Sequence, residues 1–360
     1  MLNFIYNASP MRVLYGEGST ERLPSEISRL KKCRPLLLST PHRKNNLADL
    51  VKILEKSSIL VAGTFDGAVM HTPVAVTETA LSHIENLAAD CIISYGGGST
   101  IGLGKALSIR TRLPHIAIPS TYAGSEMTPI LGETKDGLKT TRSDPAILPT
   151  TVIYDVRTTL TLPVGVSMTS GINAIAHAIE ALYAKNINPL IEMLALEGIR
   201  RLTEALPHVA TEPNDLTARS AAQYGAWLCG ICLGSVGMGL HHKLCHTLGG
   251  SWNLPHAETH TIVLPHALAY NAPAIPQVMV KLAAVIPDSE GNAIEGLEKL
   301  LEKVGFKKGL KDYGMQEHDI AEAAQIAAQS QYPNVREIEA TKITEVIRRC
   351  WAGEPARPDL

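Results

Sequence analysis

Short aliphatic runs alternate with helix-like segments through the first half of the chain, and this alternation restricts the folds that are open to it. Residues 35–40 form a largely apolar run, as do residues 91–95 and 116–119, and helix-like segments separate them. Runs that are apolar on both faces are typical of parallel strands covered by helices. The repetition predicts a doubly wound α/β layer on a mainly parallel sheet. The other elements expected in this half are strands at 12–16 and 59–62, a strand pair near 134–141 and 151–154, and helices at 19–30, 47–56 and 76–87.

The strand pattern stops near residue 160, and helical periodicity then continues almost to the end. A chain of 360 residues exceeds one typical domain, so two domains are expected. We place an α/β domain at residues 1–160 and an all-helical domain at residues 161–360.

Three glycines at residues 96–98 separate one apolar run from a helix expected to begin at Ser99 or Thr100. Helix N-termini present unpaired N–H groups and the positive end of the helix dipole, and glycine lets the backbone approach phosphate oxygens closely. Many structural loops contain such glycines. Their placement between strand and helix nevertheless favours binding of a dinucleotide pyrophosphate by Gly97, Gly98 and Ser99.

Two further loops at strand ends point to the same ligand. PSTYAGSE at residues 119–126 follows an expected strand, and ligands of such folds bind at the carboxyl ends of parallel strands, so Ser120 and Thr121 are assigned to the cofactor. After the first long strand the chain reads STPHRK at residues 39–44, without an acid that would repel a 2′-phosphate. We therefore expect Thr40 to contact the cofactor, and we expect use of both NADH and NADPH.

The richest segment of the second half is GLHHKLCHTLGGSWNLPHAETHTIVLPHALAYN at residues 239–271, which holds six of the 13 histidines. His242 and His246 are four residues apart and share one face of an expected helix, which Gly249 and Gly250 are predicted to end. His256 follows a proline turn and can converge on the same point. Core histidines that cluster without a function are the alternative interpretation, but this spacing favours a site.

A second polar pair with the same spacing opens the helical half. Asn173 and His177 lie in GINAIAHAIE and share a helix face. An isolated pair of this kind would more often lie on a helix surface. The hypothesis that two such helices face each other across a cleft depends on both pairs together.

Composition excludes several classes of function. The net charge is −2 with no long run of one sign, so we expect no nucleic-acid partner and no binding to a membrane surface. The sequence has no stretch of about 20 apolar residues and no export signal, so a cytoplasmic location is expected. Cys229 and Cys232 have the spacing of a redox motif, but their apolar neighbours favour the interior of a helix.

Taken in order, GGGS, the PST…GSE loop, GINAIAHAIEA and GLHHKLCHTLGG…LPH resemble the iron-containing alcohol dehydrogenase family, and the resemblance covers almost the whole chain. It implies a dehydroquinate synthase-like fold with an N-terminal nicotinamide-binding domain, an all-helical C-terminal domain, a cleft between them, and a homodimer. In metal-containing members an Asp and three His hold the ion. The corresponding residues here are Asn173, His177, His242 and His256, with His246 as a further cleft residue.

Several departures from the family pattern bear on function. Asn173 replaces the Asp, and an amide oxygen brings no negative charge to a cation. Gly102 stands where the phosphate loop usually has Asp, and Lys243 follows His242 where a small residue is usual. The loop that contains Tyr122 is one residue shorter than usual. These features resemble the branch of the family that reduces an activated carbon–carbon double bond in aromatic-compound degradation.

The substrate of that branch is an enone with two carboxylates. Hydride addition β to its ketone leaves an enolate whose charge is spread, so hydrogen-bond donors can take the place of a metal ion, and we expect no metal. The residues assigned to catalysis are Asn173, His177, His242, His246 and His256. Those assigned to the small dicarboxylate substrate are Lys243, Tyr122 and His241, and the resemblance adds Lys139 to the cofactor site. The alternative for Lys243 is a side chain that reaches into solvent.

Two other interpretations stay open. The first is a metal-dependent alcohol or glycerol-type dehydrogenase that uses three histidines and Asn173, which metal analysis would distinguish. The second is a nucleotide-binding sensor without catalysis. The combination of histidines and a lysine argues against a sensor, because a sensor needs no such group.

Overall fold

The computed structural model describes residues 4–9, 11–136, 138–329 and 332–360, and for Lys139 it describes the backbone alone. The chain divides into two compact units. Ala8–Leu162 forms the first, called the α/β unit below, and Pro163–Leu360 with residues 4–7 forms the second, called the helical unit. Among the described residues, no helix is long and apolar enough to cross a membrane.

The α/β unit is built on a six-stranded sheet. Its strands are β1 (Arg12–Tyr15), β2 (Pro35–Leu38), β3 (Gly63–Phe65), β4 (Cys91–Gly96), β5 (His115–Pro119) and β8 (Thr151–Tyr154). They lie in the order β1-β8-β5-β4-β2-β3, and every pairing is parallel. This confirms the parallel α/β class predicted from the sequence.

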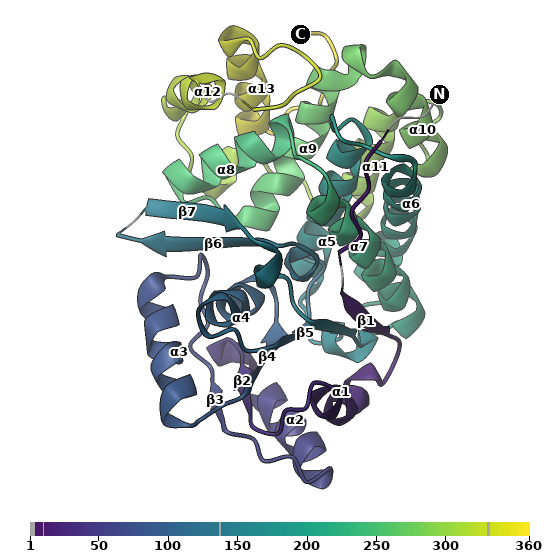
Figure 1. Cartoon of the computed structure of the whole chain (residues 1–360). Helices are drawn as coiled ribbons and strands as arrows, with labels where there is room; N and C mark the ends of the chain where they lie inside the picture. Colours follow the sequence, from purple (N-terminus) through teal and green to yellow (C-terminus); the bar gives the residue numbers. More distant parts are fainter. Residues whose placement is uncertain (1–3, 10, 137, 330–331) are drawn as a thin grey trace. The chain divides into compact units, whose positions relative to one another are not determined.

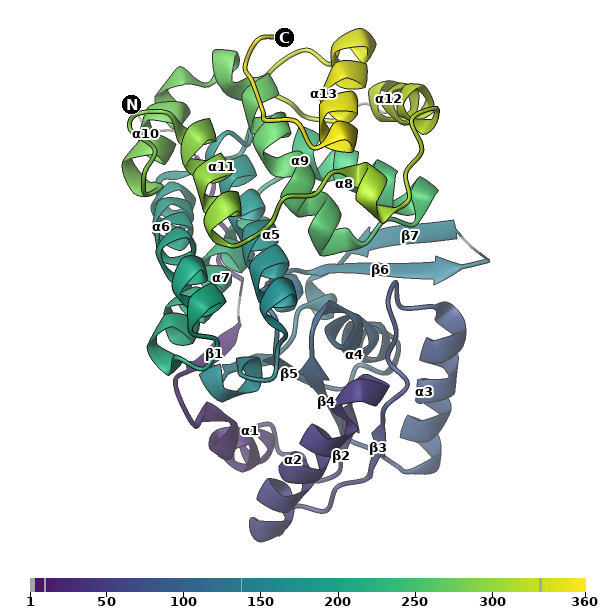
Figure 2. The same ribbon diagram turned by 180° about the vertical axis from the view of Figure 1, so that it is seen from behind.

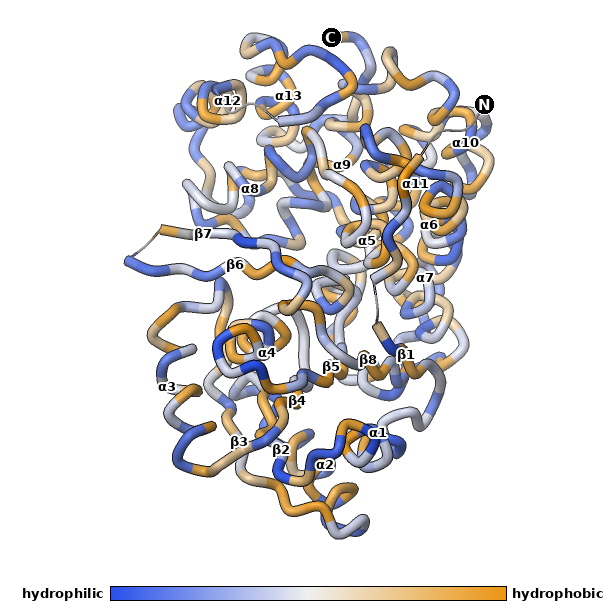
Figure 3. The backbone as a smooth tube through the Cα atoms, viewed as in Figure 1, coloured by the Kyte–Doolittle hydropathy of each residue, from blue (hydrophilic) through white to orange (hydrophobic). Residues whose placement is uncertain are grey.

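Helices cover both faces of this sheet. They are α1 (Leu23–Arg29), α2 (Lys44–Lys56), α3 (Val74–Asn86) and α4 (Gly98–Thr111). Leu37 and Ile93 point into a core with α1 and α2, whereas their neighbours Leu36 and Ile92 point into a core with α3 and α4. Figures 1 and 2 show the two pairs of helices on opposite sides of the strands. The strands are hydrophobic over much of their length, as double burial requires (Figure 3).

Two strand predictions are wrong in detail. The segment expected to pair with residues 151–154 is itself an antiparallel hairpin of β6 (Ile130–Lys135) and β7 (Leu138–Ser143), and β8 instead joins the parallel sheet between β1 and β5. The strand expected at 59–62 is displaced to β3. Ile59 is apolar because its side chain is buried beneath α2, not because its backbone pairs in the sheet.

The helical unit contains nine α-helices in its described part. They are α5 (Val164–Leu182), α6 (Pro189–Thr211), α7 (Leu216–Ser235), α8 (Leu240–Trp252), α9 (His256–Asn271), α10 (Pro276–Val285), α11 (Ala293–Lys303), α12 (Asp319–Gln329) and α13 (Ala340–Ala352). Helix α5 is buried from Ser167 to Leu182 and packs against α6, α7 and α9, while α8 packs against α9. The all-helical class predicted for this half is confirmed.

Helix α8 is longer than predicted. It continues through Gly249 and Gly250 and ends at Trp252, followed by Asn253 in the left-handed conformation with φ 51°. Asn adopts this conformation more readily than most residues, so it can terminate the helix where Gly was expected to. Cys229 and Cys232 lie buried inside α7, as their apolar neighbours predicted.

Candidate active site

Six histidines of the helical unit form a group in which each ring lies against at least two others, and this group is called the histidine cluster below. They are His177 from α5, His241, His242 and His246 from α8, and His256 and His260 from α9. The ring centroids of His177 and His242 are 5.0 Å apart, and those of His256 and His260 are 4.2 Å apart. Helices α5, α8 and α9 thus bring the polar residues of three separate sequence segments to one place.

Glu180, one turn after His177 on α5, orients His242. Its Oε2 lies 2.5 Å from Nδ1 of His242, and its carboxylate also accepts the backbone N–H groups of His241 and His242 at 2.8 and 3.3 Å. Burial opposes ionisation of Glu180, but its hydrogen bond to His242 and its electrostatic interaction with that ring lower its pKa to about 2. An ionised carboxylate can only accept, so we assign the Nδ1 proton of His242 to this bond. Nε2 of His242 then faces the cluster, where no described residue bonds to it.

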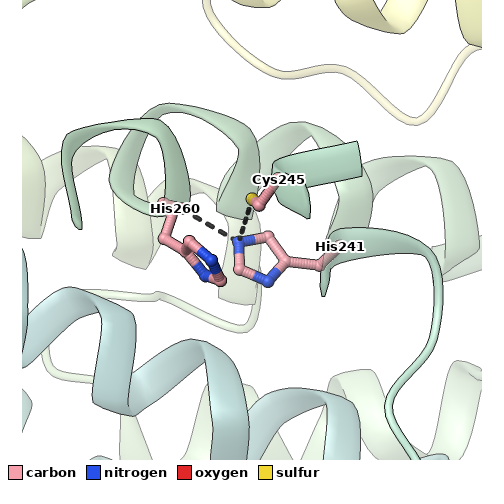
Figure 4. A group of neighbouring side chains, drawn as sticks. All are labelled: His241, Cys245 and His260. Carbon is pink, nitrogen blue, oxygen red and sulfur yellow. Dashed lines mark hydrogen bonds between the residues drawn. The ribbon is translucent and has the colours of Figure 1, made fainter. Parts of the chain in front are cut away.

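The ring of His241 contacts the backbone of α9 and the side chain of Cys245. Its Nε2 donates to the backbone oxygen of His260 at 2.9 Å, and Sγ of Cys245 lies 3.6 Å from the same nitrogen (Figure 4). His241 is fully buried in this structure. It supports the packing of α8 against α9, and its assignment to the substrate stays a prediction.

Three of the six imidazoles in the cluster are held neutral. Burial and then the neighbouring rings lower the pKa of His177 and of His260 well below the ordinary value for histidine. Burial likewise lowers the pKa of His241 to about 4. Neutral imidazoles can donate or accept single hydrogen bonds, but they bring no charge, so the ionised Glu180 is the principal charge beside His242.

Asn173 lies one turn before His177 on α5, and it is 2% exposed. Within the described part of the chain, Oδ1 of Asn173, Nδ1 of His177 and both ring nitrogens of His260 lack hydrogen-bond partners. A buried polar atom without a partner costs roughly 1–3 kcal/mol. Several such atoms together are typical of a site where a polar ligand completes the hydrogen bonds.

A metal site of the type found in this family would require His177, His242 and His256 to present ligand atoms to one point. Among the described residues, the groups of three whose ligand atoms lie within 4.8 Å of one another are His241, Cys245, His260 and Glu180, His241, His242. Both groups depend on His241, whose Nε2 is already hydrogen-bonded to a carbonyl. The three expected histidines do not form such a group, and Asn173 brings no negative charge, so the donor set differs from that of the family's metal site; the absence of a metal stays a prediction.

Lys243 follows His242 on α8 and is half-buried, with its Nζ 5.9 Å from the centroid of the Tyr332 ring. An ammonium over an aromatic face is partly withdrawn from water. A cation can bind a carboxylate, and the assignment of Lys243 to a substrate carboxylate stays a prediction.

The glycine loop of the α/β unit provides an open helix N-terminus. Gly97 precedes α4 and Gly98 is its first residue, with Ser99 in the same turn. A Cβ at Gly97 would lie 2.8 Å from Cγ2 of Thr121, whereas a Cβ at Gly98 would have no neighbour within 4 Å. The backbone at Gly98 is therefore accessible to a phosphate, so these residues fit the pyrophosphate of a dinucleotide.

The loop after β5 lies against the glycine loop. Ser120 is buried and its backbone N–H donates to the carbonyl of Gly96 at 3.0 Å, which places Thr121 beside Gly97. Tyr122 is fully buried in this structure, and its assignment to the substrate stays a prediction.

Thr40 lies at the same end of the sheet as the glycine loop. Leu38 of β2 pairs with Ser94 of β4, so both strands end there. Thr40 precedes the short 3₁₀ helix Pro41–Arg43 as its N-cap. Lys139, the remaining residue assigned to the cofactor, has its backbone in β7, and its side chain lies outside the described residues.

Sequence reasoning missed two members of the site. Glu180 stands three residues after His177, a spacing that places both on one side of a helix, and this signal was available in HAIE. His260 stands four residues after His256 and contacts five other histidine rings. The same four-residue spacing that identified His242 and His246 would have found it.

Comparison with known proteins gives matches over the whole chain. The model of the iron-containing alcohol dehydrogenase family matches residues 10–156, and that of the C-terminal part of the Fe-containing alcohol dehydrogenase family matches residues 167–351. A maleylacetate reductase of Rhizobium sp. (strain MTP-10005) is 49% identical over 359 residues, which is 100% of each chain. A solved maleylacetate reductase from Agrobacterium tumefaciens superposes with a TM-score of 0.94 at 49% identity, covering 99% of this chain and 100% of the other. A solved protein from Ralstonia eutropha JMP134, described as a putative alcohol dehydrogenase, has a TM-score of 0.96 at 48% identity and 99% coverage of both chains.

Proposed function

The chain belongs to the iron-containing alcohol dehydrogenase family, and within it we propose that it is a maleylacetate reductase, which uses NADH or NADPH to reduce maleylacetate to 3-oxoadipate in aromatic-compound degradation. The observation that carries the proposal is the pairing of His242 with the ionised Glu180, next to the rings of His177, His241 and His260, which burial keeps neutral. The full-length similarity to maleylacetate reductases supports the choice of substrate. We further propose that the chain acts as a cytoplasmic homodimer.

Maleylacetate is a 4-oxo-hex-2-enedioate, an enone with a carboxylate at each end. When bound, the reduced nicotinamide supplies a hydride to the carbon β to the ketone. The electrons of the double bond move to the ketone oxygen as an enolate, and a proton must reach the neighbouring carbon. The reaction consumes one proton from solvent for each hydride.

The roles of the side chains follow from their surroundings. Nε2 of His242 carries the proton to the carbon, because the Glu180 carboxylate on Nδ1 stabilises the imidazolium form. Asn173 and His177 bind the ketone oxygen and its enolate through hydrogen bonds. Lys243 pairs with one substrate carboxylate. The open N-terminus of α4 at Gly98 binds the cofactor pyrophosphate.

The proposed reaction needs no metal ion. A conjugate acceptor spreads the developing charge over several atoms, so hydrogen bonds can stabilise it without a Lewis acid. Asn173 supports this part of the proposal, because it removes the only anionic ligand from the family's metal-binding positions. A metal-dependent alcohol or glycerol-type dehydrogenase is the competing function.

The test is NADH and NADPH oxidation with maleylacetate, before and after chelation, with simple ketones and glycerol-type alcohols as comparison substrates. We expect reduction of maleylacetate that chelation leaves intact. Lys243→Met should raise KM for maleylacetate about tenfold, equal to about 1.4 kcal/mol, and leave KM for NADH unchanged. Activity restricted to alcohols, or activity lost on chelation and restored by a divalent ion, would establish the competing function instead.

A further inference from the structure

Lys105 is a fully buried lysine that the proposed chemistry does not use. It lies on α4, seven residues after Gly98, and its side chain has no exposed surface. Its Nζ donates to Oγ1 of Thr128 and to the backbone oxygen of Ile130, both at 2.9 Å, and also to the backbone oxygen of Ser125. The Lys105 ammonium therefore bonds to three residues of one segment, residues 125–130.

The charge of Lys105 is only partly compensated. Burial lowers its pKa to about 7, with Glu126 acting in the opposite direction. Glu126 is also buried; it accepts a hydrogen bond from the hydroxyl of Tyr154 at 2.7 Å, and burial raises its pKa. Replacing buried charges by apolar residues of similar size is often neutral or stabilising. The hydrogen bonds of Lys105 satisfy buried acceptors, and because all of these lie in one segment they also fix the position of that segment.

The three acceptors follow directly on the loop that contains Ser120 and Thr121. At its start this loop is held by the bond from the Ser120 N–H to Gly96, and Thr121 lies against Gly97. At its end, Ser125 begins the 3₁₀ turn Ser125–Met127, where Lys105 holds it. Because Lys105 and Gly98 belong to the same helix, a shift of the loop relative to the phosphate-binding turn would break these bonds.

We propose that Lys105 is a positioning residue for the cofactor: it holds the Ser120–Thr121 loop in register with the N-terminus of α4, so that both contact one nicotinamide dinucleotide. The proposal rests on the proposed function, because it requires these two loops to bind NADH or NADPH. Lys105 itself does not touch the cofactor and acts through the backbone of the loop.

The test is direct titration of the full chain with NADH, followed by fluorescence, for the unmodified protein and for Lys105→Met. We expect Kd for NADH to rise about tenfold or more, equal to about 1.4 kcal/mol, with KM for maleylacetate unchanged at saturating NADH. Leu54→Ala is the matched control, because Leu54 is fully buried in α2 of the same unit on the other face of the sheet. It should lower the melting temperature and leave Kd for NADH unchanged.

Thr128→Val provides a second variant if Lys105→Met does not fold. It keeps the volume of Thr128 and removes one acceptor, so Kd for NADH should rise by a smaller factor. Unchanged Kd in the folded variants, with only the melting temperature lowered, would show that Lys105 is purely structural and overturn the proposal. Failure of the unmodified protein to bind NADH or NADPH would overturn the proposed function itself. This outcome differs from the one that overturns the role of Lys105 alone.

Discussion

Nδ1 of His242 lies 2.5 Å from Oε2 of Glu180, and both side chains are buried. The same carboxylate receives two backbone N–H groups from the first turn of α8. Glu180 therefore determines both where α8 begins and which nitrogen of His242 is available for a ligand. Nε2 of His242, which no described residue bonds, is the nitrogen that we propose as the proton carrier.

Replacing Glu180 by Gln should lower kcat for maleylacetate reduction by roughly 10²-fold, because an amide cannot stabilise the protonated ring by charge. Kd for NADH should not change, because Glu180 bonds to α8 and is not among the residues assigned to the cofactor. Steady-state kinetics and cofactor titration measure the two effects. Glu197→Gln on α6 of the same unit is the control and should retain full kcat; an equally active Glu180→Gln would remove His242 from its proposed role.

The pairing also predicts how stability depends on pH. The pKa of Glu180 is about 2 in the folded chain, against 4.5 for an unperturbed carboxyl. A lowered pKa stabilises the fold above about pH 4.5, and this contribution, on the order of 3 kcal/mol, is lost as the pH falls from there towards 2. Urea unfolding of the unmodified protein and of Glu180→Gln should therefore differ most above pH 5, and by progressively less as the pH falls towards 2. A constant difference across this range would show that Glu180 is not ionised.

Gly98→Val should weaken cofactor binding without harming the fold. A Cβ at Gly98 has open space around it, so the branched side chain would meet the phosphate and not the protein. We expect KM for NADH to rise about tenfold or more, equal to about 1.4 kcal/mol. Gly165→Val in the first turn of α5 is the matched control, because its Cβ also has no neighbour within 4 Å. Normal cofactor affinity in a folded Gly98→Val protein would refute the phosphate-binding assignment.

Asn173→Asp should increase affinity for a divalent ion and impair maleylacetate reduction. The new carboxylate is buried, so it needs a cation or a proton, and it replaces an amide that can donate to the enolate oxygen. Metal content after dialysis against Zn²⁺ and kcat for maleylacetate are the two measurements. Asn188→Asp is the control, because Asn188 is an N-cap that Asp can replace. Stoichiometric metal in the unmodified protein would contradict the metal-free proposal.

The class of fold was readable from the sequence because it depends on periodicity. Leu36 and Leu37 lie on opposite faces of one strand and are both apolar, which is the pattern of a doubly covered strand. The end of α8 was not readable, because packing against α9 carries the helix through Gly249 and Gly250 to Asn253. The hairpin β6–β7 was predicted only as one strand near 134–141, because a strand pattern does not specify which strands pair.

The candidate site was readable only in part, for a similar reason. Histidine is a rare residue with specific chemistry, so the sequence predicted most of the histidine cluster. Glu180 is one of many helical glutamates, and its role depends on a contact with His242, which is 62 positions later in the chain. Such a contact comes from tertiary packing, which the local spacing of residues does not specify.

Gly102 restricts which residues a redesigned phosphate loop can carry at this position. A Cβ at this position would lie 2.6 Å from Oγ1 of Thr72, and Thr72 itself has φ 44°. Restoring the aspartate that the family usually carries there would therefore create a collision unless position 72 changed as well. A phosphate loop transplanted from a relative should therefore fit this scaffold only when the side chain at position 72 moves aside or is exchanged with it.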